Sequence, residues 1–521
     1  MPRPQSAKAD FVLLQRRVSN PPTSNPPPNN PPPPFALIVP IPIHYLTASE
    51  VATRIREGSL TSEEAVRACL ARIEALNPRF NIVVDLHAEA AIAAAREADA
   101  TTARGESRGP LHGVPITVKD VYDVAGMRIT FGWVMARNNV PRADAFAVAR
   151  LRGAGAIVMG ITNAPLGSYD WQCWNPLYGR TNNPWDESRT PGGSSGGSSA
   201  AIAAGLSPLE LGSDAAGSIR VPVHFCGVLG MKPTETRVSG RGHGHFRDLP
   251  YALRHICTYG PIARSVEDLE MAMRLLVAPD PSFPDAPPVP FEPRPEPSPD
   301  TLRIAWTDAF GGYSVSRDTA AAVRSVADAL EAAGARVRYA APEAIDGDVA
   351  LETWGEINGF ETGVALPMVA RVPMSYGAAL RFGGGAFTRG LRRGMAFHAR
   401  RYFRALDRRD RACGEFEAFM ADCDAWICPV ASVPAITHRR TGAPVEVDGR
   451  RVPYSMALGA WTSMVAMLGV PAIVLPAGRS TDGLPIGVQV VGRRWDDAGV
   501  LAVARVVERL TGGFRPPPGL E

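Results

Sequence analysis

Lysine is rare in this chain, and one lysine lies where a neutral amine would be useful. Only Lys8, Lys119 and Lys232 occur among 55 lysine and arginine residues. Arginine stays protonated in proteins, whereas a buried lysine can lose its proton and act as a base. Lys119 lies in the apolar run Gly113–Asp120, which is compatible with such burial.

Two glycine-rich segments that carry serines follow Lys119. Gly192–Ser199 is the densest Gly/Ser stretch of the chain, and Asp214–Arg220 contains Ser218. A serine hydroxyl is a weak nucleophile until a base takes its proton. A candidate lysine base followed by two serine-bearing turns indicates serine-nucleophile chemistry that does not use histidine.

Three other interpretations compete with this one. Gly192–Gly196 fits the G-x-S-x-G nucleophile elbow with Ser194 as nucleophile, but Arg189–Pro191 is a poor end for the strand that an elbow requires. A phosphate-binding loop is disfavoured because no Gly-Lys-Ser/Thr follows the glycines. A binding protein without catalysis is the alternative outside enzymes, and the filled lysine and serine positions count against it.

The bulk composition is that of an ordinary globular protein. The 521 residues are 45% hydrophobic and 21% charged, and the net charge of +3 gives no reason to expect nucleic acid or a membrane surface as partner. Seven cysteines without a CxxC pair predict reduced thiols in a cytoplasmic protein. His243 and His245 have no nearby ligands to complete a metal site, so no metal is expected. The arginines of 389–411 have helical spacing and are predicted to form a solvated face.

The sequence pattern predicts one extension, one catalytic domain and a short tail. Residues 1–43 are Pro-rich and expected to be disordered, 44–515 form the domain, and 516–521 are a C-terminal tail. Within the domain, 280–300 is predicted to be a surface linker. Residues 350–420 are expected to be helical and to form a lid or part of the substrate pocket.

Local signals place the elements that must position the serines and Lys119. Thr47–Glu50 and Thr61–Glu64 fit the capping box that begins a helix, and Asn77-Pro78 is expected to end the second of these helices. Strand and helix patterns alternate between Leu302 and Tyr339, which predicts an α/β fold. We expect a large mixed, mostly parallel β-sheet with helices on both faces.

The two serine segments and the lysine segment strongly resemble the amidase signature family. The likeness is carried by Gly192–Ser198, by Gly212–Pro222 and by Gly230–Thr234, and it extends over about Tyr45–Gly512. Lys119 precedes Ser194 by 75 residues and Ser194 precedes Ser218 by 24, both as the family has them. The resemblance implies the amidase signature fold and an amidohydrolase without metal or organic cofactor.

The resemblance also implies the role of each residue. Ser218 would be the nucleophile. Ser194, which would follow a cis peptide bond, would relay the proton, and Lys119 would be the neutral base. The backbone N–H groups of four residues would form the oxyanion hole; these are Ala215, Ala216, Gly217 and Ser218. Ala216 stands where many members have glycine, so a positive φ there would be strained. Three further residues would support the site: Asp214 and Arg220 hold the nucleophile loop, and Ser195 anchors Lys119.

The substrate is expected to be a small-molecule amide. If Tyr169, Trp171 and Trp174 line the pocket, an apolar or aryl amide such as an anilide is favoured, with esters or carbamates as side substrates. Within the family, the alternative is the glutamine-hydrolysing component of a tRNA amidotransferase, known as its A subunit. The stretch between Thr234 and Gly260 does not resemble that component closely. Family members are often dimers, so a homodimer is expected.

Overall fold

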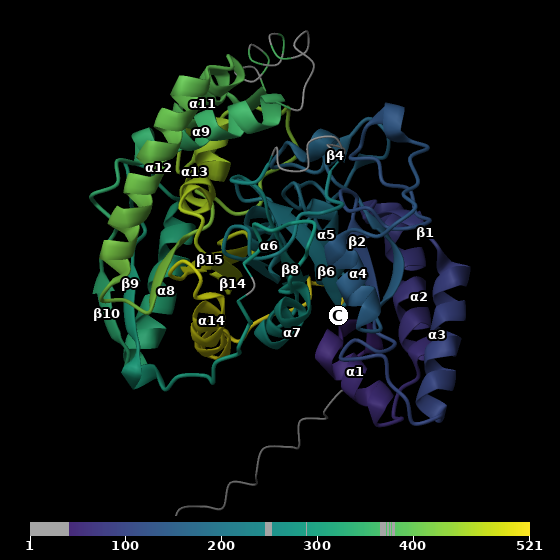
Figure 1. Ribbon diagram of the computed structural model, residues 1–521. Helices are drawn as coiled ribbons and strands as arrows, with labels where there is room; N and C mark the ends of the chain where they lie inside the picture. Colours follow the sequence, from purple (N-terminus) through teal and green to yellow (C-terminus); the bar gives the residue numbers. More distant parts are fainter. Residues whose placement is uncertain are drawn as a thin grey trace, which may run out of the picture. The chain divides into compact units, whose positions relative to one another are not determined.

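The computed structural model describes residues 41–244, 253–287, 289–364, 371, 373, 375, 377 and 381–521 (Figure 1). Pro42–Glu521 forms one compact unit. The predicted disordered extension, 1–43, and His245 lie almost entirely outside the described residues, and the division into domains stays a prediction. In the described part of the chain, no helix combines the length and apolar character needed to cross a membrane.

The first two helices begin where their capping boxes predict. α1 (Ala48–Arg56) starts after Thr47, whose hydroxyl accepts from the Glu50 N–H at 3.1 Å while the Glu50 carboxylate accepts from the Thr47 N–H at 2.8 Å. α2 (Ser62–Phe80) has the same arrangement at Thr61. The prediction that α2 ends at Asn77-Pro78 is wrong by one turn: the helix continues to Phe80 and ends at Asn81, which has a left-handed φ of 50°.

A small three-stranded sheet carries Lys119. It has the order β1 (Val83–Leu86), β3 (Ile157–Thr162) and β2 (Pro115–Lys119), with β2 parallel to β3 and β1 antiparallel to it. Every residue of β2 is buried, which explains its continuous apolar pattern. Lys119 is the last residue of β2. Because β2 contacts strand β6 of the large sheet, this end of the small sheet lies beside the large one.

The large sheet has eight strands in the order β10-β9-β11-β15-β14-β7-β8-β6. The strands are β6 (Leu209–Asp214), β7 (Leu229–Lys232), β8 (Thr258–Ala263), β9 (Arg303–Trp306), β10 (Arg336–Tyr339), β11 (Ala425–Pro429), β14 (Ala472–Arg479) and β15 (Pro485–Val491). The α/β class and the large mixed sheet are confirmed. The expected parallel majority is not: only β10–β9 and β9–β11 are parallel, while the other neighbours are antiparallel. In this sheet the alternation of strands and helices that produces parallel pairs is limited to the segment from β9 through β10 to β11, whereas β14 and β15 form a hairpin.

Helices cover both faces of this sheet (Figure 1). Alternate residues of one strand enter two different cores: Ile473 and Leu475 of β14 lie in one, Ala472 and Val474 in the other. The first core is completed by α7 (Val266–Leu276), α8 (Arg317–Ala332) and α14 (Asp497–Thr511). The second is completed by α5 (Gly196–Ala203), α6 (Arg220–Cys226) and α13 (Tyr454–Met467).

Helices also make up most of the described part of the region 350–420, with close packing between two of them. The elements are α9 (Gly347–Val364), α11 (Ala386–Met395) and α12 (Ala399–Met420). A Cβ on Gly390 of α11 would lie 2.0 Å from the Glu352 carbonyl oxygen of α9, and one on Gly359 of α9 would lie 2.2 Å from that of Leu391. Glycine at these positions lets the two backbones touch.

The basic run of α11 and α12 is only partly the solvated face that its spacing predicts. Arg392, Arg400 and Arg404 are exposed. Arg409, however, is buried, pairs with Glu235 and donates from Nε to the Met467 carbonyl oxygen at 2.7 Å. The helical spacing is right, but it does not reveal that α12 turns one of its arginines toward the core.

The glycine contact between α9 and α11 yields a stability prediction. Gly390→Ala should lower the free energy of unfolding by about 1–3 kcal/mol, because the added methyl meets a backbone carbonyl that cannot rotate away. Gly414→Ala is the matched control, because Gly414 is an exposed glycine of α12 and no atom lies within 4 Å of a Cβ built there. This substitution should raise the free energy of unfolding by about 0.5–1 kcal/mol. Equal effects of the two changes in urea unfolding would contradict this packing argument.

Candidate active site

Lys119 is fully buried and its amine is held by hydroxyl groups. Nζ donates to Ser194 Oγ at 2.7 Å and to Ser213 Oγ at 3.1 Å. Burial lowers the pKa of this amine to about 8, against the opposing influence of acidic groups nearby. An amine with that pKa loses its proton around pH 8, well below the usual range of lysine, and its neutral form can accept a proton from the hydroxyl it touches.

Ser194 stands at the entrance to α5, after a cis peptide bond between Gly193 and Ser194. Its Oγ accepts from Lys119 Nζ and also from Ser168 Oγ, which lies 2.9 Å away. The next residue, Ser195, donates its backbone N–H to the carbonyl oxygen of Ser218 at 2.9 Å. Ser194 is therefore connected to Lys119 through its side chain, and its neighbour is connected to the Ser218 loop through the backbone.

The implied role of Ser195 as the anchor of Lys119 is not what the structure shows. The Ser195 hydroxyl is buried and has no hydrogen-bond partner among the described residues. Ser213, the last residue but one of β6, takes the second bond from Lys119 instead. Ser213 belongs to the Gly212–Pro222 motif, yet only the side-by-side placement of β2 and β6 reveals its contact.

Ser218 lies on the loop between β6 and α6, which a buried ion pair holds. Asp214 and Arg220 are both fully buried, with Arg220 Nη2 2.8 Å from Asp214 Oδ1. Burial alone would raise the pKa of Asp214, but the Arg220 charge and hydrogen bonds lower it to about 2. Arg220 also donates to the Thr462 carbonyl oxygen and to Gln489 Oε1, each at 2.8 Å. These contacts place both residues at the loop that carries Ser218, while their supporting role stays a prediction.

Of the four predicted oxyanion donors on the Ser218 loop, one is engaged within the loop and three are not. The Gly217 N–H already donates to Asp214 Oδ1 at 2.8 Å, so it is engaged inside the loop. The N–H groups of Ala215, Ala216 and Ser218 donate to no group among the described residues. The positive φ of 106° falls on Gly217 rather than on Ala216, so alanine at 216 is not strained. Three of the four predicted oxyanion donors are thus free to bind an anion.

A cavity of about 530 Å³ opens onto these groups. Its lining includes Ser194, Ser213, Ala215 and Ser218 at the reacting end. Most of the remaining wall is apolar; it is formed by Phe131, Trp133, Met135, Leu166, Tyr169, Leu253 and Ile256. Region 350–420 contributes Asn358, Thr362 and Arg381 to the same lining, so it forms part of the pocket.

The three aromatic residues predicted for the pocket have three different positions. Tyr169 lines the cavity. Trp171 is buried beside it, lines a smaller adjoining space and donates its indole N–H to the Ala216 carbonyl oxygen at 3.0 Å. Trp174 is 53% exposed and lies outside the lining of the cavity at Ser218. The sequence analysis missed Phe131, Trp133 and Ser168, for which no motif or spacing gives a signal.

Lys232, the third lysine, has a different environment. It is buried in β7, and Nζ donates to the carbonyl oxygens of Pro233 at 2.9 Å and Val470 at 2.8 Å. These contacts tie the strand to a neighbouring segment. Among the lysines that the structure describes, Lys119 alone contacts the serines.

Comparisons with known proteins show which family the chain resembles over most of its length. The family described as Amidase matches residues 64–501. An acylamidase of Rhodococcus erythropolis is 32% identical over 489 residues, which cover 89% of this chain and 94% of the relative. The A subunit of the glutamyl-tRNA(Gln) amidotransferase of Moorella thermoacetica is 33% identical over 502 residues, 92% of this chain and 99% of the relative. Among solved structures, 6-aminohexanoate cyclic dimer hydrolase complexed with substrate has a TM-score of 0.76 at 28% identity, covering 92% of this chain and 100% of its own.

The chain therefore belongs to the amidase signature family, and it is an amidohydrolase. The resemblance carried by the lysine and serine motifs is confirmed. The hydrolase and amidotransferase relatives have nearly the same identity to this chain, so overall similarity does not separate the two kinds of activity.

The buried ion pair behind the nucleophile loop yields a prediction. Arg220→Met should destabilise the protein by about 3–5 kcal/mol at pH 7, because it leaves Asp214 charged and unpaired in the core. Without Arg220, burial raises the pKa of Asp214, so the folded variant can protonate this carboxylate and the loss should become smaller as the pH is lowered. Arg400→Met, at an exposed arginine of α12, should change the free energy of unfolding by less than about 0.5 kcal/mol. Denaturant unfolding of both variants at pH 7 and pH 5 measures these changes. A loss below about 1 kcal/mol at pH 7 for Arg220→Met would contradict a stabilising role of the buried ion pair.

Proposed function

We propose that the protein cleaves the C–N bond of a carboxylic amide through an acyl-enzyme on Ser218, with Ser194 as proton relay and Lys119 as base. The observation that carries this is the 2.7 Å hydrogen bond from a fully buried lysine amine to the Ser194 hydroxyl, at the end of a cavity that also exposes Ser218. A lysine kept away from water and from any ion pair among the described residues is suited to accept a proton.

The reaction follows from the order of these groups. Ser218 Oγ attacks the amide carbonyl carbon, and its proton passes to Ser194 as the Ser194 proton passes to the neutral Lys119 amine. The oxygen that becomes negative binds the N–H groups of Ala215, Ala216 and Ser218, a type of stabilisation worth about 3 kcal/mol per donor. The C–N bond then breaks and the leaving amine takes a proton back through Ser194. Water attacks the resulting ester by the same relay and releases the acid.

In the described structure no hydrogen bond joins Ser194 and Ser218. Ser194 Oγ instead accepts from Ser168 Oγ at 2.9 Å, at the same edge of the cavity. Catalytic hydrogen bonds often shorten only when substrate is bound. Ser168, which has a left-handed φ of 58°, would hold the relay hydroxyl until substrate brings Ser218 into contact with it.

The lining of the cavity supports an apolar or aryl amide as substrate. Phe131, Trp133 and Tyr169 provide aromatic surface, while few charged groups face the space. An anilide fits this character because its aryl amine can lie against the aromatic wall. Esters and carbamates would be side substrates, since they react through the same acyl intermediate.

Covalent labelling tests the nucleophile. A fluorophosphonate should label Ser218, and peptide mass spectrometry should locate the adduct. Lys119→Met should slow labelling by about 10²–10⁴-fold, the usual contribution of a positioned base. Label on Ser194 would favour the nucleophile elbow, and absence of label on a folded protein would favour a binding protein without catalysis.

The pKa of Lys119 sets the expected pH dependence. Because the protonated amine cannot accept a proton, kcat/KM should fall about tenfold per pH unit below about pH 8 and level off above it. Lys119→Arg keeps a positive charge that cannot be removed, so it should be inactive across this range. A flat profile from pH 6 to pH 9 in the wild-type protein would exclude Lys119 as the base.

A substrate panel separates hydrolase from amidotransferase-like activity. Acetanilide should have a kcat/KM at least about tenfold above that of acetamide, because only the anilide buries a ring in the apolar cavity. Free glutamine is the control for the amidotransferase alternative, and it should release ammonia no faster than acetamide does. Turnover limited to glutamine and other polar primary amides would overturn the apolar-pocket assignment.

A further inference from the structure

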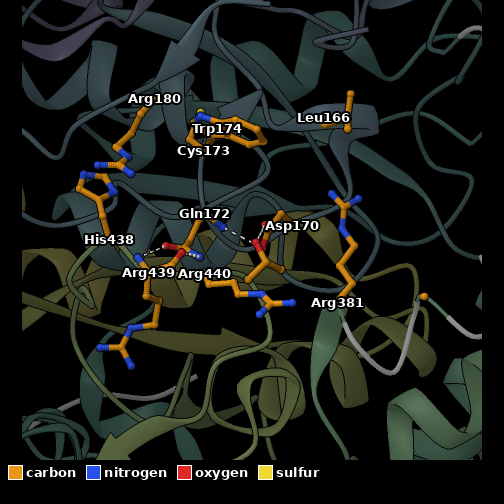
Figure 2. A pocket seen from close by; sticks show the side chains of 12 residues that line it. Leu166, Asp170, Gln172, Cys173, Trp174, Arg180, Arg381, His438, Arg439 and Arg440 are labelled. Carbon is orange, nitrogen blue, oxygen red and sulfur yellow. Dashed lines mark hydrogen bonds between the residues drawn. The ribbon is translucent and has the colours of Figure 1, made fainter. Parts of the chain in front are cut away.

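A second cleft, lined by arginines, lies beside the catalytic cavity (Figure 2). Its volume is about 530 Å³, and its charged lining consists of Arg180, Arg381, Arg439, Arg440 and Asp170, with His438. Two residues, Leu166 and Arg381, line both this cleft and the cavity that contains Ser218. The two spaces therefore adjoin at Leu166 and Arg381.

The cleft has an excess of positive charge that the described residues do not neutralise. Among the described residues, no ion pair joins a carboxylate to the Arg180, Arg381 or Arg440 guanidinium, although the charge of Arg381 counters the rise that burial causes in the pKa of Asp170. The single acidic residue, Asp170, already accepts from Tyr454 Oη at 2.6 Å and from the Thr441 hydroxyl. Whichever protonation state Asp170 has, the arginines outnumber it.

Arg439 and His438 do not add to this free charge. The Arg439 guanidinium donates to the carbonyl oxygens of Pro444 at 3.0 Å and Thr437 at 3.3 Å, and in Figure 2 it points away from the other arginines. Burial and the neighbouring Arg180 lower the pKa of His438 to about 4, so it is neutral at pH 7. His438 is further held by Asn182, whose Oδ1 lies 3.1 Å from Nε2.

Three guanidinium groups from three separate segments remain. Arg180 ends β5 (Gly179–Arg180), Arg381 precedes α11, and Arg440 follows His438. The Nε of Arg381 is buried and has no hydrogen-bond partner among the described residues. A buried N–H without a partner costs free energy, which a bound acceptor would recover.

We propose that this cleft binds a carboxylate or phosphate group carried by the amide substrate, whose scissile carbonyl lies at Ser218 in the adjoining cavity. Guanidinium groups recognise both kinds of oxyanion through paired, charge-assisted hydrogen bonds. The inference rests on the proposed hydrolase function and adds the substrate class: an amide with an apolar body and one anionic end.

Direct binding tests the oxyanion site without catalysis. Inorganic phosphate is titrated by calorimetry into the Ser218→Ala protein at constant ionic strength. Arg180→Gln and Arg440→Gln should each weaken phosphate binding about tenfold or more, the usual loss for a charged hydrogen bond. Both residues are exposed and unpaired among the described residues, so both variants should fold, which thermal unfolding verifies. Arg400→Gln removes an exposed arginine of α12 and should leave phosphate binding unchanged.

Matched substrates test whether the anion belongs to the substrate. Acetanilide is compared with 4-acetamidobenzoate, and butyranilide with the monoanilide of glutaric acid, so that the carboxylate is placed on either side of the amide. At least one carboxylated member should exceed its neutral partner in kcat/KM by about tenfold or more. The double variant Arg180→Gln/Arg440→Gln should lose this preference because KM for the carboxylated substrate rises. Its kcat/KM for neutral anilides should not change. Phosphate should compete with the carboxylated member only.

The outcomes separate the possibilities. Absence of both phosphate binding and carboxylate preference would overturn the oxyanion site. Phosphate binding that changes turnover of neutral and carboxylated anilides equally would overturn the substrate assignment in favour of a free anionic effector. A failure of the proposed hydrolase function is recognised separately, because it would abolish acetanilide turnover and Ser218 labelling while leaving phosphate binding to the arginines intact.

Discussion

A lysine amine enclosed by protein and held by two hydroxyl groups is the feature on which the rest of the site depends. Lys119 donates to Ser194 and Ser213 and forms no ion pair among the described residues. A buried ammonium is costly unless it is paired, so the surroundings favour the neutral amine. The fold achieves this by ending the buried strand β2 against β6, which places the amine between the two serine segments.

The loop that carries Ser218 depends on the opposite arrangement, a fully buried charged pair. Asp214 and Arg220 lie at the two ends of the loop, and Arg220 reaches α13 through Thr462 and β15 through Gln489. These contacts connect the Ser218 loop to elements more than 240 residues later in the chain. The site thus combines one group that burial keeps reactive with a second, paired group that keeps the loop in place.

Local sequence signals predict the parts of the structure that local interactions decide. The capping boxes at Thr47 and Thr61 satisfy N–H groups within one turn, so their outcome does not depend on the rest of the fold. The end of α2 is different, because Asn77 is satisfied by bonds to Ile82 and Val83 and the helix continues past Pro78. Likewise, helical spacing in α12 predicts a helix but not the burial of Arg409, which needs Glu235 opposite it.

The sequence by itself determined the α/β class and the family, and it singled out Lys119, Ser194 and Ser218 as candidates because they belong to motifs with a characteristic spacing. Tertiary structure alone decided which neighbours complete the site. Ser213 rather than Ser195 meets Lys119, Tyr169 lies in the cavity while Trp174 lies outside it, and Arg180, Arg381 and Arg440 line one cleft. These outcomes arise from contacts between distant segments, and a side chain's direction there depends on packing that no local pattern encodes.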